Sequence, residues 1–484
     1  MKKRIAIILA FALSLSLPAT FSACEKKRSP FVRYELVCEY RPEDAAVTGA
    51  LKVEFENPTE QPLEVLKFYL YPNAYRKNAL FPAVLENAYD EVYYSGVDYG
   101  SIAVTSVLGA KGWEIAGEDE NILEASLETP LYPKEKVVLD VGFTTRLARA
   151  KHRLGVTEEG VNLGWFYPVL CAVTETGFSE TVCSSIGDPF FADAADYLVN
   201  FTLPKEYALV CGGERLEEKT LESKKRHTVS LTNAREFAAV LSTGYEVKSA
   251  RVGKTTVEYC YLSDPTPEKT LRLAEEALGF YSAVFGEYPY FSYTLAETSL
   301  SCGGQEYSSF SVIRTELSEE ERARCVAHEL AHQWWYAAVG NDQTLSAWQD
   351  EGLAEFSAAL FFEKYGDYGL TKKGIVEAAR KNYLAYGRTY RQALGWVDLR
   401  MTRSLAEYLS EYEYKSVCFD KAVVMFDALC QSLGEKKFFA GLKKYYVENK
   451  YGVASAGDLI GAFERVGVDA TGFFEGFLNG KEIL

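Results

Sequence analysis

Two histidines four residues apart, His328 and His332, enclose Glu329 in an H-E-x-x-H pattern. Positions four apart lie on one face of a helix, so both imidazoles can bind one metal ion, and neutral imidazole is a good zinc ligand. Glu329, about 100° around the helix from His328, can flank the metal without binding it. Glu351 follows His332 after eighteen intervening residues and adds a carboxylate. The pattern predicts a zinc site with His328, His332 and Glu351 as ligands.

Such a ligand set predicts hydrolytic chemistry. Two histidines and one carboxylate leave the fourth tetrahedral position of zinc open for water, as in catalytic sites. A zinc-bound water has a pKa of about 7, so Glu329 can take its proton and act as general base. Glu355 lies one helical turn after Glu351, and we expect it to orient His328 from outside the ligand set. The chain has only four histidines, so a chance H-E-x-x-H is rare.

Two helices are expected to position these residues. Ser318 and Glu321 form an S-x-x-E capping box for the first helix, which Gly340 can close. Ser346 begins an S-x-x-Q cap for the second helix, which we expect to run to Gly366. A turn between them is long enough to fold the second helix antiparallel to the first, so that Glu351 faces the histidines.

The segments HELAHQWW and WQDEGLAEF resemble the aminopeptidase N family of gluzincin zinc metallopeptidases. That family follows H-E-x-x-H, after eighteen residues, with Glu in a W-x-x-E-G-x-A setting, which Trp348, Glu351, Gly352 and Ala354 match. The resemblance implies one zinc ion, peptide substrates and a thermolysin-like catalytic domain. Within the family, the resemblance is to short bacterial lipoprotein-type members, because larger members add a C-terminal helical domain that we do not expect here.

Upstream, CGGQEYSSF resembles the family's G-[GA]-M-E-N motif, with Gly303, Gly304 and Glu306 matching and Gln305 and Tyr307 departing from it. The resemblance implies that Glu306 holds the free α-amine of a peptide. An anionic carboxylate near the zinc suits an ammonium group, and glycines let an extended substrate backbone approach closely. We therefore expect Gly303, Gly304 and Glu306 to bind substrate; the alternative for Glu306 is a solvated position at a strand end.

One departure concerns the family's catalytic tyrosine. The segment YKSVCFDKA aligns with the family's Y-x-K-G pattern so that Phe419 stands where the tyrosine belongs. Phenylalanine has no hydroxyl to stabilise an oxyanion. We expect Tyr414, in preference to Tyr412, to supply the missing hydroxyl, with plain packing or surface roles as the alternative.

The N-terminal sequence is typical of a targeting segment. Residues 1–23 combine a basic start, an apolar run too short to favour a membrane span, and Phe21-Ser22-Ala23-Cys24, which resembles a lipobox. We expect Cys24 to be lipidated, residues 24–30 to be a linker, and the protein to be extracytoplasmic and anchored to the cell membrane by lipid. Secretion after ordinary cleavage is the alternative.

Net charge is −16, and loss of the three basic residues of the leader would take it to −19. This acidity argues against nucleic acid as a partner and mildly favours cationic peptides. The nine cysteines beyond Cys24 lack paired spacing, so we expect mostly buried thiols with room for one or two disulfides. Asp188, Asp193 and Asp196 cluster as in a Ca²⁺ loop, but lack an EF-hand spacing, so turn and surface roles are preferred.

The predicted fold class is α+β. Alternating segments such as RYELVCEY and KVVLDVGFTT indicate a β-rich N-terminal saddle or sandwich domain over residues 31–249. Helical periodicity dominates residues 250–484, the expected thermolysin-like, mainly α catalytic domain. The function we expect is a zinc-dependent aminopeptidase. A zinc endopeptidase, or a weakly active or inactive zinc-retaining peptide-binding lipoprotein, are the alternatives.

Overall fold

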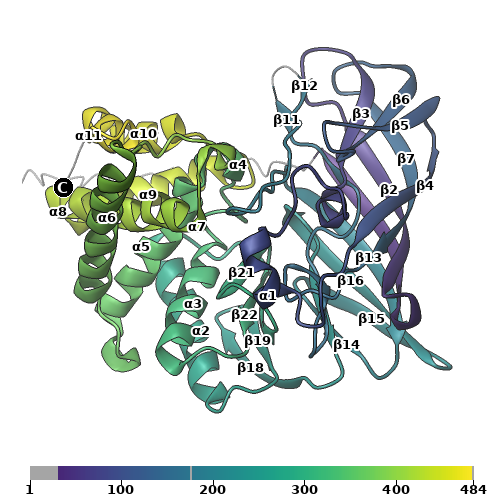
Figure 1. Cartoon of the computed structure of the whole chain (residues 1–484), viewed down its shortest axis with the longest axis horizontal. Helices are drawn as coiled ribbons and strands as arrows, with labels where there is room; N and C mark the ends of the chain where they lie inside the picture. Colours follow the sequence, from purple (N-terminus) through teal and green to yellow (C-terminus); the bar gives the residue numbers. More distant parts are fainter. Residues whose placement is uncertain (1–30, 175–176, 482–484) are drawn as a thin grey trace, which may run out of the picture.

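The computed structural model describes residues 31–174 and 177–481. Strands from β1 (Val32–Arg41) to β17 (Ala239–Ser242) form a β-rich half, on the right in Figure 1. Helices from α2 (Pro267–Val284) to α11 (Thr471–Leu478) gather on the left. The predicted signal peptide, Cys24 and the linker lie outside the described residues. No helix in the described part of the chain is both long and apolar enough to cross a bilayer.

The largest sheet has the strand order β15-β16-β13-β1-β2-β7-β4. Its remaining strands are β2 (Ala46–Glu56), β4 (Ser101–Leu108), β7 (Lys136–Arg146), β13 (Ala195–Pro204), β15 (Glu214–Leu221) and β16 (Lys224–Ala234). Every second residue of β1 is buried, from Val32 to Tyr40, because alternate side chains of a strand point to opposite faces. The sheet therefore keeps one face in the core, as the alternation in the sequence predicts.

Smaller sheets complete the β-rich half among the described residues. One has the order β10-β3-β6-β5, another β14-β17-β9-β8, and β11 pairs with β12. Their strands are β3 (Leu63–Tyr69), β5 (Gly112–Ala116), β6 (Ile122–Leu131), β8 (Leu154–Val156), β9 (Val161–Leu163), β10 (Val169–Leu170), β11 (Val173–Thr174), β12 (Gly177–Phe178) and β14 (Ala208–Cys211), with the short helix α1 (Tyr89–Val92) beside them.

The C-terminal half contains a mixed sheet in the order β18-β19-β20-β22-β21. Its strands are β18 (Glu246–Val252), β19 (Thr255–Tyr261), β20 (Ser292–Thr298), β21 (Gly304–Tyr307) and β22 (Phe310–Arg314). The expected division after residue 249 falls inside β18, whose partner is β19. We propose a division before Glu246, which keeps this sheet whole.

Helices cover the rest of this half. They are α3 (Glu319–Ala331), α4 (Gln343–Ser346), α5 (Trp348–Lys364), α6 (Lys372–Leu394), α7 (Glu411–Tyr414), α8 (Ala422–Leu433), α9 (Glu435–Asn449) and α10 (Ala456–Glu464). The buried apolar side chains of both halves form one continuous cluster. The α+β class predicted from the sequence is confirmed: strands dominate the first half and helices the second.

The nine cysteines in the described residues are all free thiols, six of them buried. The expectation of mostly buried thiols agrees with this arrangement, and no disulfide joins any pair among them.

The three aspartates considered for calcium have separate partners. Asp188 pairs with Arg153, Asp193 accepts from the backbone of Val173, and Asp196 accepts from the backbone of Asn233.

Candidate metal centre and substrate cleft

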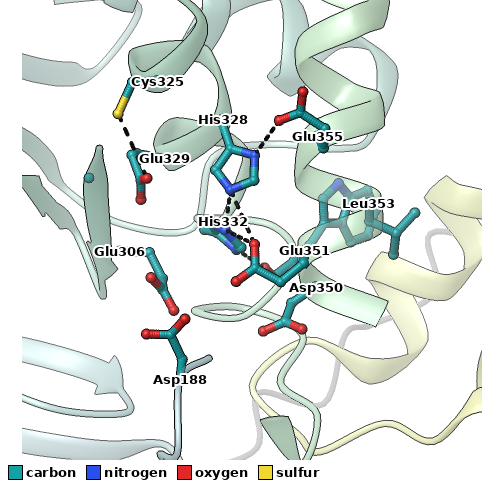
Figure 2. Close-up of polar contacts among 12 residues, drawn as sticks. Asp188, Glu306, Cys325, His328, Glu329, His332, Asp350, Glu351, Leu353 and Glu355 are labelled. Atoms are coloured by element: carbon teal, nitrogen blue, oxygen red, sulfur yellow. Dashed lines mark hydrogen bonds and ion pairs between the residues drawn. The ribbon is translucent and has the colours of Figure 1, made fainter. Parts of the chain in front are cut away.

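The predicted ligands meet at one point. Nε2 of His328 and Nε2 of His332 lie 3.0 Å apart, and Glu351 Oε2 lies 3.2 and 3.4 Å from them. Figure 2 shows the imidazole of His328 on α3, that of His332 at the end of this helix, and the Glu351 carboxylate from α5 converging. One ligand atom from each of the three buried side chains lies within 4.8 Å of the others, a group able to hold a metal ion.

The surroundings of the imidazoles fit a bound cation. His328 Nδ1 faces Glu355 Oε2 at 2.9 Å, and His332 Nδ1 faces the carbonyl oxygen of Trp335 at 3.0 Å. Both Nδ1 atoms therefore carry the proton that their acceptors require, and both Nε2 atoms turn a lone pair toward the same point. Glu351 Oε2 is buried without a hydrogen-bond partner. A divalent cation at this point satisfies all three atoms, as the zinc prediction requires.

Charge and burial have opposite effects on the pKa values of these ligands. Burial alone would lower the pKa of His328, but the facing carboxylates of Glu351 and Glu355 hold it well above its usual value. Burial would raise the pKa of Glu351, yet the two imidazoles that face it at 3.2 and 3.4 Å bring it to about 2. The carboxylate is therefore ionised at neutral pH, the state in which it binds metal.

Helix α3 ends earlier than predicted. Ser318 caps it through the expected box with Glu321, but the helix stops at Ala331, and Gly340 does not close it. His332 occupies the cap position, and the chain then turns so that the Ala337 amide donates to the His332 carbonyl. This turn frees the Trp335 carbonyl, which a continuing helix would have used for its own hydrogen bonding, and points it at His332.

The start of the second helix also differs from the prediction. Ala347, not Ser346, is the N-cap of α5, and Ser346 is the last residue of α4. The reason is that Asp342 caps α4 by accepting from the Thr344 amide, so the preceding segment is already helical. Glu351 still lies in the first turn of α5 and faces the histidines, as expected.

Glu329 points into the cleft from α3. Its Oε2 is buried without a hydrogen-bond partner, and Oε1 lies 3.9 Å from Cys325 Sγ. Burial raises the pKa of Glu329 to about 7 although the two imidazoles act to lower it. A side chain on Gly304 would approach Glu329 Oε1 to 2.5 Å and Cys325 Sγ to 2.7 Å. Glycine at 304 therefore lets β21 pass close to the helix that carries the metal ligands.

Glu306 lies on β21, buried beside the metal group. Its Oε1 accepts from Gln343 Nε2 at 3.0 Å, and its Oε2 accepts from Gln305 Nε2 at 2.5 Å. Oxygens of Glu306 and Glu329 and a nitrogen of His332 lie within 4.8 Å of one another. Burial, followed by the nearby charge of Asp188, raises the pKa of Glu306 well above its usual range. Glu306 thus holds a buried carboxyl group beside the metal group, between two glutamine amides.

Asp188 was not expected in the site. Its carboxylate faces that of Glu306 in Figure 2, accepts from Gln305 Nε2 at 2.9 Å and pairs with Arg153 at 2.8 Å. Asp188 and Arg153 both come from the β-rich half, more than a hundred residues from the zinc motif. Gln343 of α4 was missed as well. No spacing rule joins Asp188 or Arg153 to the zinc motif, and no motif marks Gln343, so only the fold reveals them.

Tyr414 reaches the metal group and Phe419 flanks it. The Tyr414 hydroxyl donates to Glu351 Oε1 at 3.5 Å, and the Phe419 ring stacks on His328 with centroids 5.8 Å apart. A π-helical segment, residues 415–421, follows Tyr414. Its i, i+5 register brings Tyr414 and Phe419 to the same side, with ring centroids 5.6 Å apart. Tyr412 instead packs on Tyr386.

These residues line one open cleft of about 590 Å³. Both halves of the chain contribute to it, and its ionisable lining is mainly acidic: Asp188, Glu306, Glu321, Glu329, Glu351, Glu355 and Glu411 against Arg153, Arg324 and Lys415, with the two histidines between them. Such a volume suits a few residues of an extended peptide.

Comparison with known proteins agrees with this geometry. Residues 307–477 match the peptidase family M1 domain. Aminopeptidase N of Lactococcus lactis subsp. lactis is 26% identical over 224 residues, which are 43% of this chain and 26% of that protein. The match thus spans about a quarter of the length of that relative.

Solved structures share the whole fold. An M1 zinc metallopeptidase from Deinococcus radiodurans superposes with a TM-score of 0.62 at 17% identity, covering 94% of each chain. A mutant of an M1 zinc metallopeptidase from the same organism, bound to a Tyr-Ser-Ala substrate, gives 0.62 at 16% identity over 94% of this chain and 95% of that one. At this identity the likeness concerns the fold.

Fold and site together place His328 of α3, His332 at its C-cap and Glu351 of α5 where they could hold one metal ion. The match of residues 307–477 to the peptidase family M1 domain agrees with the resemblance to aminopeptidase N in the sequence.

Proposed function

We propose that this protein is a zinc-dependent aminopeptidase that hydrolyses the first peptide bond of peptides with a free N-terminus. The observation that carries the proposal is the buried carboxylate of Glu306 beside the metal group. A buried carboxylate crowded by Asp188 is unfavourable without a positive partner, and a peptide α-ammonium supplies one through charge-assisted hydrogen bonds.

The same region favours removal of one residue over internal cleavage. Asp188, fixed by its ion pair with Arg153, stands on the far side of Glu306 from the metal ligands (Figure 2). The Arg153 guanidinium in turn packs over the Phe190 ring, 5.0 Å from its centroid. We infer that these side chains obstruct the path that an N-terminal extension of the substrate would need. On this proposal the peptide extends from the metal in one direction only.

The chain's own residues then divide the chemistry. Bound zinc would be held by His328, His332 and Glu351 and would supply a Lewis acid for the scissile carbonyl. Glu329 accepts a proton from the attacking water and returns it to the leaving amine, a task that suits its pKa of about 7. The Tyr414 hydroxyl donates a hydrogen bond to the developing oxyanion. Phe419 cannot do so because its ring has no hydroxyl. Glu355 keeps the His328 ring in its metal-binding tautomer.

Turnover of amino-acid amides and matched N-acetylated peptides tests the proposal. We expect chelator-sensitive hydrolysis of free N-termini only, restored by zinc and lost in the Glu329→Gln variant, which controls for contaminating peptidase. Cleavage of the blocked peptides would instead identify an endopeptidase. Stoichiometric zinc binding without turnover would identify a peptide-binding protein, the alternative that Phe419 raises.

We further propose, from the sequence, that Cys24 carries a lipid that anchors the mature protein outside the cytoplasm. The support is the lipobox-like Phe21-Ser22-Ala23-Cys24 after an apolar run. Expression of the full chain and of Cys24→Ser, followed by detergent phase partitioning, tests this. The unmodified chain should enter the detergent phase and Cys24→Ser should not; equal partitioning would favour plain secretion.

A further inference from the structure

The turn that follows His332 contains a strained residue. Tyr336 is buried and has φ 131°, a conformation that suits glycine and strains a bulky residue. The peptide plane that precedes Tyr336 carries the Trp335 carbonyl, which accepts from His332 Nδ1 at 3.0 Å. The φ angle of Tyr336 therefore helps to set where that carbonyl points. If the backbone relaxed, His332 would lose the acceptor that fixes its tautomer.

Two residues of the β-rich half hold this turn. Arg235 and Glu236, between β16 and β17, are both fully buried. The Arg235 guanidinium donates from Nε to the Tyr336 carbonyl at 2.6 Å, and the Tyr336 hydroxyl donates to Glu236 Oε2. Both the backbone and the side chain of Tyr336 are thereby tied to the same dipeptide, which we name the Arg235–Glu236 clamp.

The Arg235 guanidinium of the clamp has further contacts that fix its position. Arg235 also donates to the carbonyls of Ala192 at 3.0 Å and Gly452 at 2.7 Å, one in the β-rich half and the other near the C-terminus. A side chain on Gly340 would come within 2.1 Å of the guanidinium carbon, so glycine there makes room for Arg235. The guanidinium thus has fixed partners that keep it aimed at the turn.

The same dipeptide also reaches the strand that carries Glu306. The Ser308 amide donates to Glu236 Oε1 at 2.5 Å, and the Arg235 amide donates to Ser308 Oγ at 3.0 Å. Ser308 lies in the turn between β21 and β22, two residues after Glu306. One clamp therefore connects the metal-binding turn with the substrate-binding strand.

We propose that Arg235 and Glu236 are positioning residues for the metal centre. They hold Tyr336 in its left-handed backbone conformation and so direct the Trp335 carbonyl to His332 Nδ1. The β-rich half thereby contributes to metal retention, in addition to lining the cleft. The inference rests on the metal site and not on the proposed aminopeptidase activity, because zinc retention is measured without substrate.

Zinc affinity of full-length variants, measured by competition with a chromophoric chelator, tests the proposal. Loss of an outer partner of a ligating histidine typically weakens metal binding about 10- to 100-fold, and we expect that range for Glu236→Ala. Adding Tyr336→Gly should return the affinity to within about 3-fold of wild type, because glycine adopts φ 131° without a clamp. A merely structural role of Glu236 would not give this rescue. The absorption spectrum of the cobalt-substituted protein should shift and recover in parallel.

Asp119→Asn is the matched control. Asp119 is also buried in the β-rich half and accepts from Arg76 and from the Phe81 amide, away from the cleft. Its loss should lower stability and leave zinc affinity unchanged. A folded Glu236→Ala protein with wild-type affinity, or a double variant no better than the single one, would overturn the proposal. Should Glu236→Ala not fold, Tyr336→Phe cuts only the hydroxyl link and should weaken zinc binding at least about 3-fold; an unchanged affinity would then overturn the proposal.

Discussion

Replacing Tyr414 by Phe removes a single hydroxyl from the cleft. In the structure this hydroxyl lies 3.5 Å from Glu351 Oε1, a long hydrogen bond that contributes little to stability. The ring keeps its edge-on contacts with Tyr408 and Phe419, with centroids 5.5 and 5.6 Å away. Because Phe419 offers no hydroxyl, Tyr414 is the nearby phenol that can face the oxyanion. The variant should therefore lose rate and keep its fold.

Loss of one oxyanion donor costs about 10²- to 10³-fold in kcat, or about 2.7–4 kcal/mol of transition-state stabilisation. We expect Tyr414→Phe to lower kcat by this factor on an amino-acid amide, with KM changed little. The thermal midpoint should stay within about 2 °C, as for a loss of well under 1 kcal/mol. Steady-state kinetics and a melting curve of the zinc-loaded protein measure both quantities.

Tyr412→Phe is the control for this prediction. Tyr412 is 47% exposed and packs on Tyr386 and Tyr390, so removal of its hydroxyl should leave kcat unchanged. Wild-type turnover in Tyr414→Phe would refute the oxyanion role. A similar loss in both variants would show that the effect comes from the aromatic packing around the helix and not from one hydroxyl.

Three further predictions concern metal binding and stability. Glu355→Ala removes the acceptor of His328 Nδ1, and should weaken zinc binding about 10- to 100-fold; an unchanged affinity in chelator competition would exclude a role for Glu355 in orienting the histidine. Removing zinc should lower the thermal midpoint, because a ligand present at 100 times its Kd adds about 2.7 kcal/mol to stability, and equal melting curves with and without chelator would contradict this. Burial, then the charge of Arg403, lowers the pKa of Lys421 from 10.5 to about 7. The folded state therefore binds fewer protons than the unfolded chain between these pH values, so the free energy of unfolding should rise with pH there. The slope should be smaller in Lys421→Met, and equal slopes in urea titrations would contradict the assignment.

The zinc ligands could be predicted from the sequence because their spacing is a local property. His328 lies on α3 and His332 is its C-cap, and the capping box of this helix is encoded within the four residues from Ser318 to Glu321. The exact ends of the helices were harder to predict from the sequence. The sequence around Gly340 permits a helix end, but the tertiary contacts of the turn at Tyr336 stop α3 nine residues earlier, at Ala331.

Residues brought in from the β-rich half could not be predicted. Asp188 appeared in the sequence only as one of three clustered aspartates, yet it faces Glu306, which lies 118 residues further along the chain. No sequence pattern predicted the Arg235–Glu236 clamp, because its positioning role depends on the backbone angle of Tyr336 and on carbonyls from distant segments. Long-range contacts of this kind follow from the packing of the two halves and not from any motif.

The ratio of kcat/KM for a peptide with a free N-terminus to that for its N-acetylated form, in wild type and in Glu306→Gln, tests the central claim most directly. Glutamine keeps the size of the side chain and removes the charge that the α-ammonium would meet. A hydrogen bond to a charged group contributes about 1.5–3 kcal/mol, so we expect the ratio to fall about 10- to 100-fold while zinc content stays at one per chain. An unchanged ratio in a zinc-loaded, folded Glu306→Gln protein would contradict the assignment of this cleft to an aminopeptidase.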